Sequence, residues 1–219
     1  MGRSMAMAPL IQKGRHISDA ANNADPYQVI RGRVNGLKKA PDARLMSYLE
    51  QAGFGSAASI RTFDLHYDLL SALVERWRPE TQTFHFPCGE CTLLGDSPED
   101  EESNFTSLKF TWLKAKFGQL SANATEGELM CAARAYIMHI LGGVLMSDAN
   151  NNRVHMMYLP LLADLSNVRS YSWGSAVLAM LYRELYRATN SDIVDMGGCL
   201  TLLQSWALYR MPFLASVSH

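Results

Sequence analysis

Two cysteines form the sharpest chemical motif in the sequence, Cys88-Gly-Glu-Cys91. Two thiols at this spacing can share a zinc ion or form a redox pair. A structural zinc site needs four ligands, however, and neither a second Cys-x-x-Cys nor a histidine pair stands at a matching distance. His85 is nearby, while Cys131 and Cys199 are isolated on helical patterns. We interpret the motif as a turn after a strand and expect no bound metal.

Other catalytic groups lack the partners that their chemistry requires. Gly174-Ser175 lies in a helical pattern and lacks the second glycine of a serine-hydrolase turn. His66 and His139 lie on helical stretches, where a hydrogen-bonded structural histidine is expected. The sequence has no glycine-rich phosphate loop. The lysines of the folded part share one charged helix without a phosphate-binding setting for pyridoxal chemistry: Lys109, Lys114 and Lys116. We predict a protein that is not an enzyme, without catalytic residues, cofactor-binding residues or metal ligands.

The charge of the chain is small overall but unevenly placed. The net charge of −1 gives no general attraction to nucleic acid or to membranes. Residues 1–40 nevertheless carry seven Lys or Arg against two Asp, which is typical of a solvated basic leader before an acidic globular part. We therefore predict a flexible leader over 1–41. The acidic run within 95–103 is interpreted as a solvated loop.

One segment, Met130–Met146, is apolar enough to suggest a membrane span. It carries Arg134, His139 and the pair Gly142-Gly143, so we interpret it as a buried helix and expect no membrane partner. The first residues do not form a signal peptide, because Pro9 soon interrupts a short apolar stretch. Four cysteines in a chain of this length do not make a disulfide scaffold, which favours a reducing compartment, the cytosol or the nucleus.

Hydrophobic periodicity predicts a mainly α fold, a single helical domain over 42–214 with a short strand or hairpin near 83–86 and a tail at 215–219. Asp42 opens a first helix that Gly53 ends as a left-handed cap. A second helix begins at Asp64, and Pro79 ends it. Its apolar stripe consists of Leu65, Leu69, Leu73 and Trp77.

Helices also dominate the sequence from Ser107 onward. Thr125 and Glu128 have the spacing of a capping box for a helix that continues to Leu145. Ser172 is expected to cap a later helix. The remaining predicted helices are Tyr158–Leu165 and a last one after Gly197-Gly198.

Several strings of the sequence, in order along residues 42–214, resemble one known family. They are Phe63–Thr92, Leu108–Leu113, Ala133–Ile137, Asn152–His155, Tyr171–Ala179, Leu181–Leu185 and Gly197–Leu200. Together they are similar to the plant mobile domain, a domain associated with plant transposable elements. Long collinear strings of this kind rarely arise by chance.

This resemblance implies a nuclear protein that acts without catalysis, by protein–protein contact, in meristem maintenance and in silencing of transposable elements. Some relatives carry the domain beside a serine/threonine phosphatase-like domain, so the implied partner is a phosphatase-like nuclear protein. The domain also has a legacy label, "aminotransferase-like", but this sequence contains no cofactor-binding residue that supports it. Two alternatives stay open: a DNA-binding remnant of a transposon-encoded protein, and an inactive gene fragment.

The sequence departs from the family pattern after Cys91-Thr92. The family continues there through an apolar helix and a Gly-Leu-Pro turn, whereas this chain runs directly into Leu93-Leu-Gly-Asp-Ser-Pro98. We interpret this as an internal shortening of the domain near 92–93. Loss of an apolar helix is expected to leave bare hydrophobic surface on its neighbours, above all on the stripe of the second helix.

Overall fold

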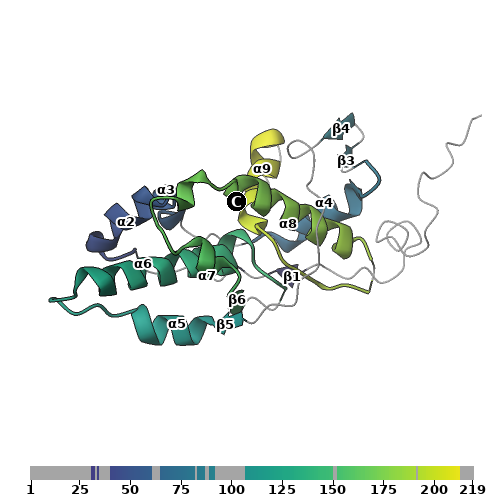
Figure 1. Ribbon diagram of the computed structural model, residues 1–219. Helices are drawn as coiled ribbons and strands as arrows, with labels where there is room; N and C mark the ends of the chain where they lie inside the picture. The colour runs from purple at the N-terminus through teal and green to yellow at the C-terminus, as the bar shows by residue number, and fades with distance from the viewer. Residues whose placement is uncertain are drawn as a thin grey trace, which may run out of the picture.

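The computed structural model describes residues 31–32, 34, 40–60, 65–81, 83–86, 89–91, 107–149, 152–190 and 192–212. Most of these residues are helical and the strands are short, which confirms the predicted mainly α fold (Figure 1). Most of the predicted leader, the acidic run within 95–103 and the tail at 215–219 lie outside the described residues. Within the predicted leader, Arg31–Gly32 forms strand β1, so this short stretch is structured.

The helices are mostly shorter than the periodicity suggests. The two longest are α6 (Glu126–Ile140) and α8 (Trp173–Ala188). The others are η1 (Ala43–Leu45), α2 (Met46–Gln51), α3 (Gly55–Ala58), α4 (Tyr67–Arg76), α5 (Phe110–Phe117), α7 (Tyr158–Leu161), η3 (Val168–Ser170) and α9 (Leu200–Arg210). Helix α6 continues into a π-helical turn, η2 (Leu141–Leu145).

Within the described ranges, three small sheets tie these helices together. Strands β2 (Trp77–Arg78), β3 (Thr83–Phe86) and β4 (Gly89–Cys91) form an antiparallel sheet in that order, and β3 confirms the strand predicted near 83–86. Strand β5 (Ser107–Lys109) pairs antiparallel with β6 (Arg153–His155). Strand β1 pairs in parallel with β7 (Asp195–Met196).

The hydrophobic core has two clusters that meet along α8. The first gathers buried side chains of η1, α2, α3, α5 and α6, and Val177 of α8 belongs to it. The second gathers α4, β2, β3 and α9 around the C-terminal half of α8, with Leu181 and Leu185 fully buried. The N-terminal part of the apolar face of α8 therefore packs in the first cluster, and its C-terminal part packs in the second.

Two of the predicted helix termini are confirmed, and the predicted cap at Ser172 is not. Thr125 and Glu128 form the predicted capping box, and Gly53 has the predicted positive φ of 81°. Ser172 is the residue before α8 but makes no side-chain cap, so that prediction was wrong. The amide of Trp173 instead donates to the carbonyl of Tyr171 at 3.0 Å.

The expected bare surface on the second helix is not found on α4. Leu73 and Trp77 are almost fully buried, and Leu65 and Leu69 are partly buried against the second cluster. Helices α8 and α9 and strand β3 supply the cover. The expectation failed because it assigned this stripe to an absent segment, whereas later helices of the same chain pack on it.

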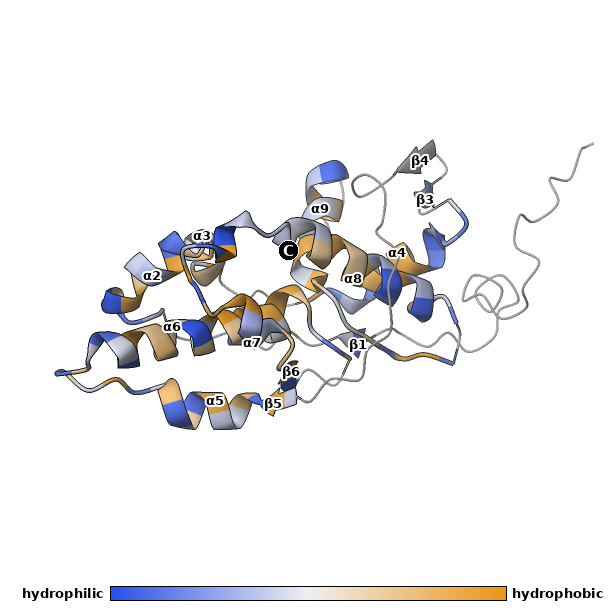
Figure 2. Cartoon of the chain, viewed as in Figure 1, coloured by the Kyte–Doolittle hydropathy of each residue, from blue (hydrophilic) through white to orange (hydrophobic). Residues whose placement is uncertain are grey.

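Helix α6 and its π-turn, Glu126–Leu145, form one helix that is long and apolar enough to cross a membrane by length and composition. Its C-terminal part and the following turn are hydrophobic (Figure 2). More than half of the most apolar stretch is buried inside the protein, and Ile137, Met138 and Leu141 belong to the first cluster. This burial agrees with the predicted buried helix.

Candidate functional site

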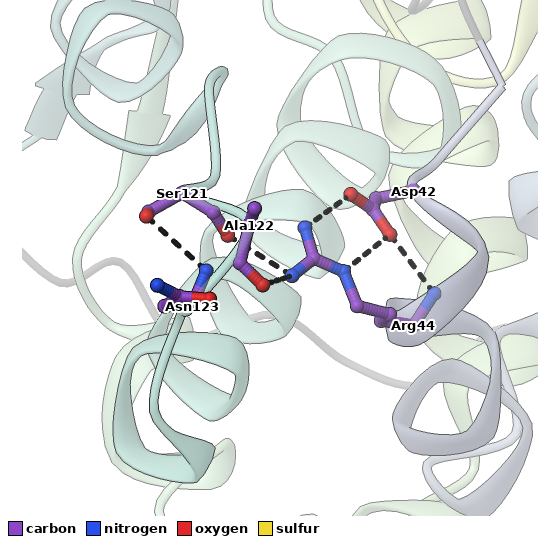
Figure 3. Close-up of polar contacts among 5 residues, drawn as sticks. All are labelled: Asp42, Arg44, Ser121, Ala122 and Asn123. Carbon is purple, nitrogen blue, oxygen red and sulfur yellow. Dashed lines mark hydrogen bonds and ion pairs between the residues drawn. The ribbon is translucent and has the colours of Figure 1, made fainter.

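Arg44 ties the start of the first helical segment to the turn between α5 and α6 (Figure 3). Its Nε and Nη2 donate to the two carboxylate oxygens of Asp42 at 3.0 and 2.8 Å. Its Nη1 donates to the carbonyls of Ser121 at 3.0 Å and Ala122 at 3.2 Å. The backbone amide of Arg44 also donates to Asp42 at 3.0 Å. These hydrogen bonds hold the pKa of Asp42 at about 2, below its ordinary value.

The Asp42–Arg44 pair gives a pH dependence that can be measured directly. A lowered carboxyl pKa stabilises the fold above its ordinary value near 4, and this contribution is lost as the pH falls toward 2. We expect the carboxyl carbon of Asp42 to titrate at about 2 by NMR, and at a higher pKa in Arg44→Ala, where only the backbone amide of residue 44 still donates. Asp164 is the internal control, because its lowered pKa comes first from Ser166. An Asp42 titration that is the same in both proteins contradicts the assignment.

A buried carboxylate holds the turn before α9. Glu184 of α8 accepts hydrogen bonds from the amide of Gly197 and from Nη2 of Arg187, both at 2.8 Å. Ser147 reinforces the turn from the other side, because its hydroxyl donates to the carbonyl of Gly198 at 2.9 Å and its own carbonyl accepts from the Gly198 amide at 2.7 Å. Two strings of the family resemblance, Leu181–Leu185 and Gly197–Leu200, thus meet in one structural contact.

Arginines in two other strings of the resemblance, Ala133–Ile137 and Asn152–His155, also have structural partners. Arg134 of α6 donates to the carbonyls of Leu162 at 2.8 Å and Ala163 at 2.7 Å, which fixes the segment after α7. Arg153 of β6 donates from Nε to the hydroxyl of Ser107 at 2.7 Å and from Nη2 to its carbonyl at 3.1 Å. These strings therefore maintain the fold.

The histidines and the serine considered from the sequence occupy separate places. His139 is buried, with its ring 4.5 Å from that of Phe110. His66 precedes α4, and its backbone amide donates to the side chain of Gln204 at 2.9 Å. Ser175 is exposed on α8. The structure does not bring these groups together as a nucleophile with its base.

Metal and thiol chemistry find little support among the described side chains. These residues contain no group of three or more His, Cys, Asp or Glu placed to hold a metal ion. Cys88 and the side chain of Cys91 lie outside the described part, so the expectation of an unmetallated motif there stays a prediction. Cys199 is buried, and burial raises the pKa of its thiol, which disfavours the reactive thiolate.

An open groove of about 440 Å³ lies between the α2–α3 turn and the segment that enters α8. Its lining residues are Glu50, Ala52, Gly53, Gly55, Ser56, Arg169, Tyr171, Ser172, Trp173 and Gly174. The indole N–H of Trp173 donates to the carbonyl of Val168 at 2.9 Å, and its ring contacts Phe54 edge to face. Tyr171 is 41% exposed. The groove therefore has one aromatic side chain that is held in place, Trp173, and a second that is exposed to solvent, Tyr171.

The lining of this groove suits binding better than catalysis. It contains Glu50, Ser56, Tyr171 and Ser172, but among the described residues no hydrogen bond joins these side chains to one another, so no hydroxyl nucleophile is paired with a base there. Three of its ten lining residues are glycines, and Gly174 faces open space. Sequence reasoning missed the groove because residues 50–56 and 169–174 are far apart in the chain. The signal was the Tyr171–Ala179 string, whose aromatic residues form part of the lining.

A protein-family model described as the plant mobile domain matches residues 53–96 and 92–217 of this chain. Protein MAIN-LIKE 2 of Arabidopsis thaliana is 31% identical over 240 residues, covering 92% of this chain and 36% of that protein. Protein MAINTENANCE OF MERISTEMS is 29% identical over 250 residues, covering 94% and 51%. A serine/threonine-protein phosphatase 7 long form homolog is 34% identical over 215 residues, covering 83% and 16%; both are also from Arabidopsis thaliana. No solved structure matches the chain.

These alignments carry two further facts. The chain spans about half or less of the length of these relatives. The alignments of 240 and 250 residues are longer than the 219-residue chain, so both relatives have residues without a counterpart here. The family match itself divides at residues 92–96. Because that match extends over well more than half of the chain, the protein belongs to the plant mobile domain family.

Proposed function

We propose that this protein is a non-catalytic interaction domain that acts in the nucleus, in meristem maintenance and transposable-element silencing, by binding a protein partner. The observation that carries the proposal is the groove between the α2–α3 turn and α8. Its volume of about 440 Å³ lies in the range typical of binding sites. It presents Tyr171, Trp173 and Arg169, and aromatic residues and arginine are enriched in protein-binding surfaces.

The groove fits an extended peptide segment of the partner. Gly174 leaves room for a second backbone to approach, because a Cβ there would meet nothing within 4 Å, whereas the Cβ positions of Gly53 and Gly55 face the side chains of Arg169 and Glu50. Arg169 and Glu50 offer a donor and an acceptor for polar groups of the segment. Tyr171 supplies an exposed aromatic surface for an apolar side chain.

The relatives' names support the biological context. One is named for maintenance of meristems and another as a phosphatase 7 long form homolog. The proposed partner is therefore a phosphatase-like nuclear protein, and purified plant serine/threonine-protein phosphatase 7 is the probe. We expect a complex by size-exclusion chromatography and a binding isotherm by calorimetry. A fluorescent fusion of the chain in plant cells tests the nuclear location, and exclusion from nuclei contradicts it.

A matched pair of glycine variants tests the groove itself. Gly174 and Gly127 both occupy the second residue of a long helix, and a Cβ at either position meets open space. Gly174→Phe fills the groove, so we expect at least tenfold weaker binding of the phosphatase, a loss of about 1.4 kcal/mol. Gly127→Phe adds the same side chain to α6, which contributes nothing to the groove lining.

The outcomes of this pair are distinct. Equal affinity of wild type, Gly174→Phe and Gly127→Phe rejects the groove as the binding site. Absence of any complex rejects this partner. Thermal unfolding of both variants checks that the added ring leaves the fold intact, which we expect because both Cβ positions face open space and phenylalanine is a better helix former than glycine.

A further inference from the structure

A basic surface with an exposed indole lies away from the groove, on β5, α5 and β6. We call it the basic stripe and define it by Lys109, Trp112, Lys116 and Arg153. These four residues are all exposed, and Trp112 is 50% exposed. The three elements contain no aspartate or glutamate. Within the described part of the chain, none of the three cations has an ion-pair partner.

Backbone geometry places the members of the stripe together. Trp112 and Lys116 are four residues apart and follow one side of α5, and Lys109 is the residue immediately before that helix. Lys109 pairs directly with Arg153 in the antiparallel β5–β6 ladder, so both side chains project from the same face. Lys114 lies on the other flank of α5, where it lines a small pocket with His139.

The direct pairing of Lys109 with Arg153 is unfavourable for the protein alone. Like charges opposite each other in a ladder destabilise it. An anion between the two cations would relieve this repulsion. Trp112 adds a flat surface that is held by an edge-to-face contact with Phe117, with ring centroids 6.0 Å apart.

We infer that the basic stripe binds single-stranded nucleic acid. Phosphates contact Lys109, Lys116 and Arg153, and an unpaired base stacks on Trp112. Cations beside an exposed aromatic ring are the combination that single-strand binders use, and the ring has no comparable role on a base-paired duplex. This surface is separate from the groove, so failure of either proposal leaves the other standing.

The test uses the whole chain and a fluorescein-labelled 12-nucleotide oligothymidine, followed by anisotropy at several salt concentrations. Three cations predict a slope of about −2 for the logarithm of affinity against the logarithm of salt. Lys109→Ala is expected to reduce that slope by about 0.7, and Lys114→Ala to leave it unchanged. Trp112→Ala is expected to weaken binding at least about fivefold through the lost stacking.

Any result of the following four kinds would overturn the inference. The first is no binding of oligothymidine at about 50 mM salt, where phosphate contacts are strongest. The second is an equal loss in Lys114→Ala and Lys109→Ala, which indicates only general charge attraction. The third is unchanged affinity in Trp112→Ala, or a 12-base-pair duplex that binds as tightly as the single strand. The fourth is displacement by polyglutamate at matched charge, which indicates an acidic protein partner. Circular dichroism confirms that each variant is folded.

Discussion

Replacement of Gly197 by alanine is expected to lower the free energy of unfolding by about 3 kcal/mol. A Cβ at this position would lie 2.4 Å from the carbonyl oxygen of Ser147 and 3.0 Å from the carbonyl carbon of Asp148. Both atoms belong to the backbone, so no side-chain rotation relieves the clash. The turn must then shift, which weakens the hydrogen bond from the Gly197 amide to the buried carboxylate of Glu184.

Urea unfolding followed by circular dichroism measures this effect. Gly174→Ala is the matched control, since the added methyl group meets open space within α8 and alanine favours a helix. We expect the control to raise the unfolding midpoint slightly and Gly197→Ala to lower it strongly. Equal midpoints for wild type and Gly197→Ala would mean that the turn before α9 is free to move and does not anchor the fold.

Replacement of Trp77 by alanine is expected to cost about 3–5 kcal/mol. Trp77 is 1% exposed and lies at the centre of the second cluster. Its ring contacts Phe84 edge to face at 4.8 Å and Tyr182 at 5.2 Å. Removal of the indole leaves a cavity between β3, α4 and α8, and these elements cannot all move inward to fill it.

Thermal unfolding gives the corresponding measurement, with an expected decrease in melting temperature of about 10 °C for a chain of this size. The control is Tyr209→Ala, because Tyr209 is 87% exposed on α9 and its removal should change stability by less than about 0.5 kcal/mol. Because α8 belongs to both clusters, we also expect one cooperative transition. Two separate transitions in Trp77→Ala would show that the clusters unfold independently.

Local sequence signals identified several elements of this fold. The Thr125 and Glu128 spacing predicted a capping box, and the aromatic stretch before Pro87 predicted strand β3. These features depend on residues three or four apart, so the sequence contains all their determinants. The helix expected from Ser107 begins only at Phe110, because Ser107–Lys109 pairs with β6. Nothing near Ser107 signals a partner strand at Arg153–His155.

The candidate sites were less accessible to sequence reasoning. Lys109, Lys114 and Lys116 were predicted to share one charged helix, whereas the structure places Lys109 in β5, where it pairs with Arg153 of β6, and Lys114 beside a small pocket. Sequence reasoning missed the groove for a similar reason, because its lining segments are far apart in the chain. Periodicity reports which residues face inward, but not which distant turns meet.

The three small sheets also bear on how fast this chain folds. Strands β2, β3 and β4 close local hairpins, whereas β5 must find β6 after α5, α6 and η2 have intervened. Strand β1 must find β7, and nearly every other described element lies between them in the chain. Helices and hairpins form in microseconds, while distant pairings carry the entropy cost of closing long loops. Refolding of this mainly helical protein should therefore be slower than its helix content suggests, with the β1–β7 contact among the last to form.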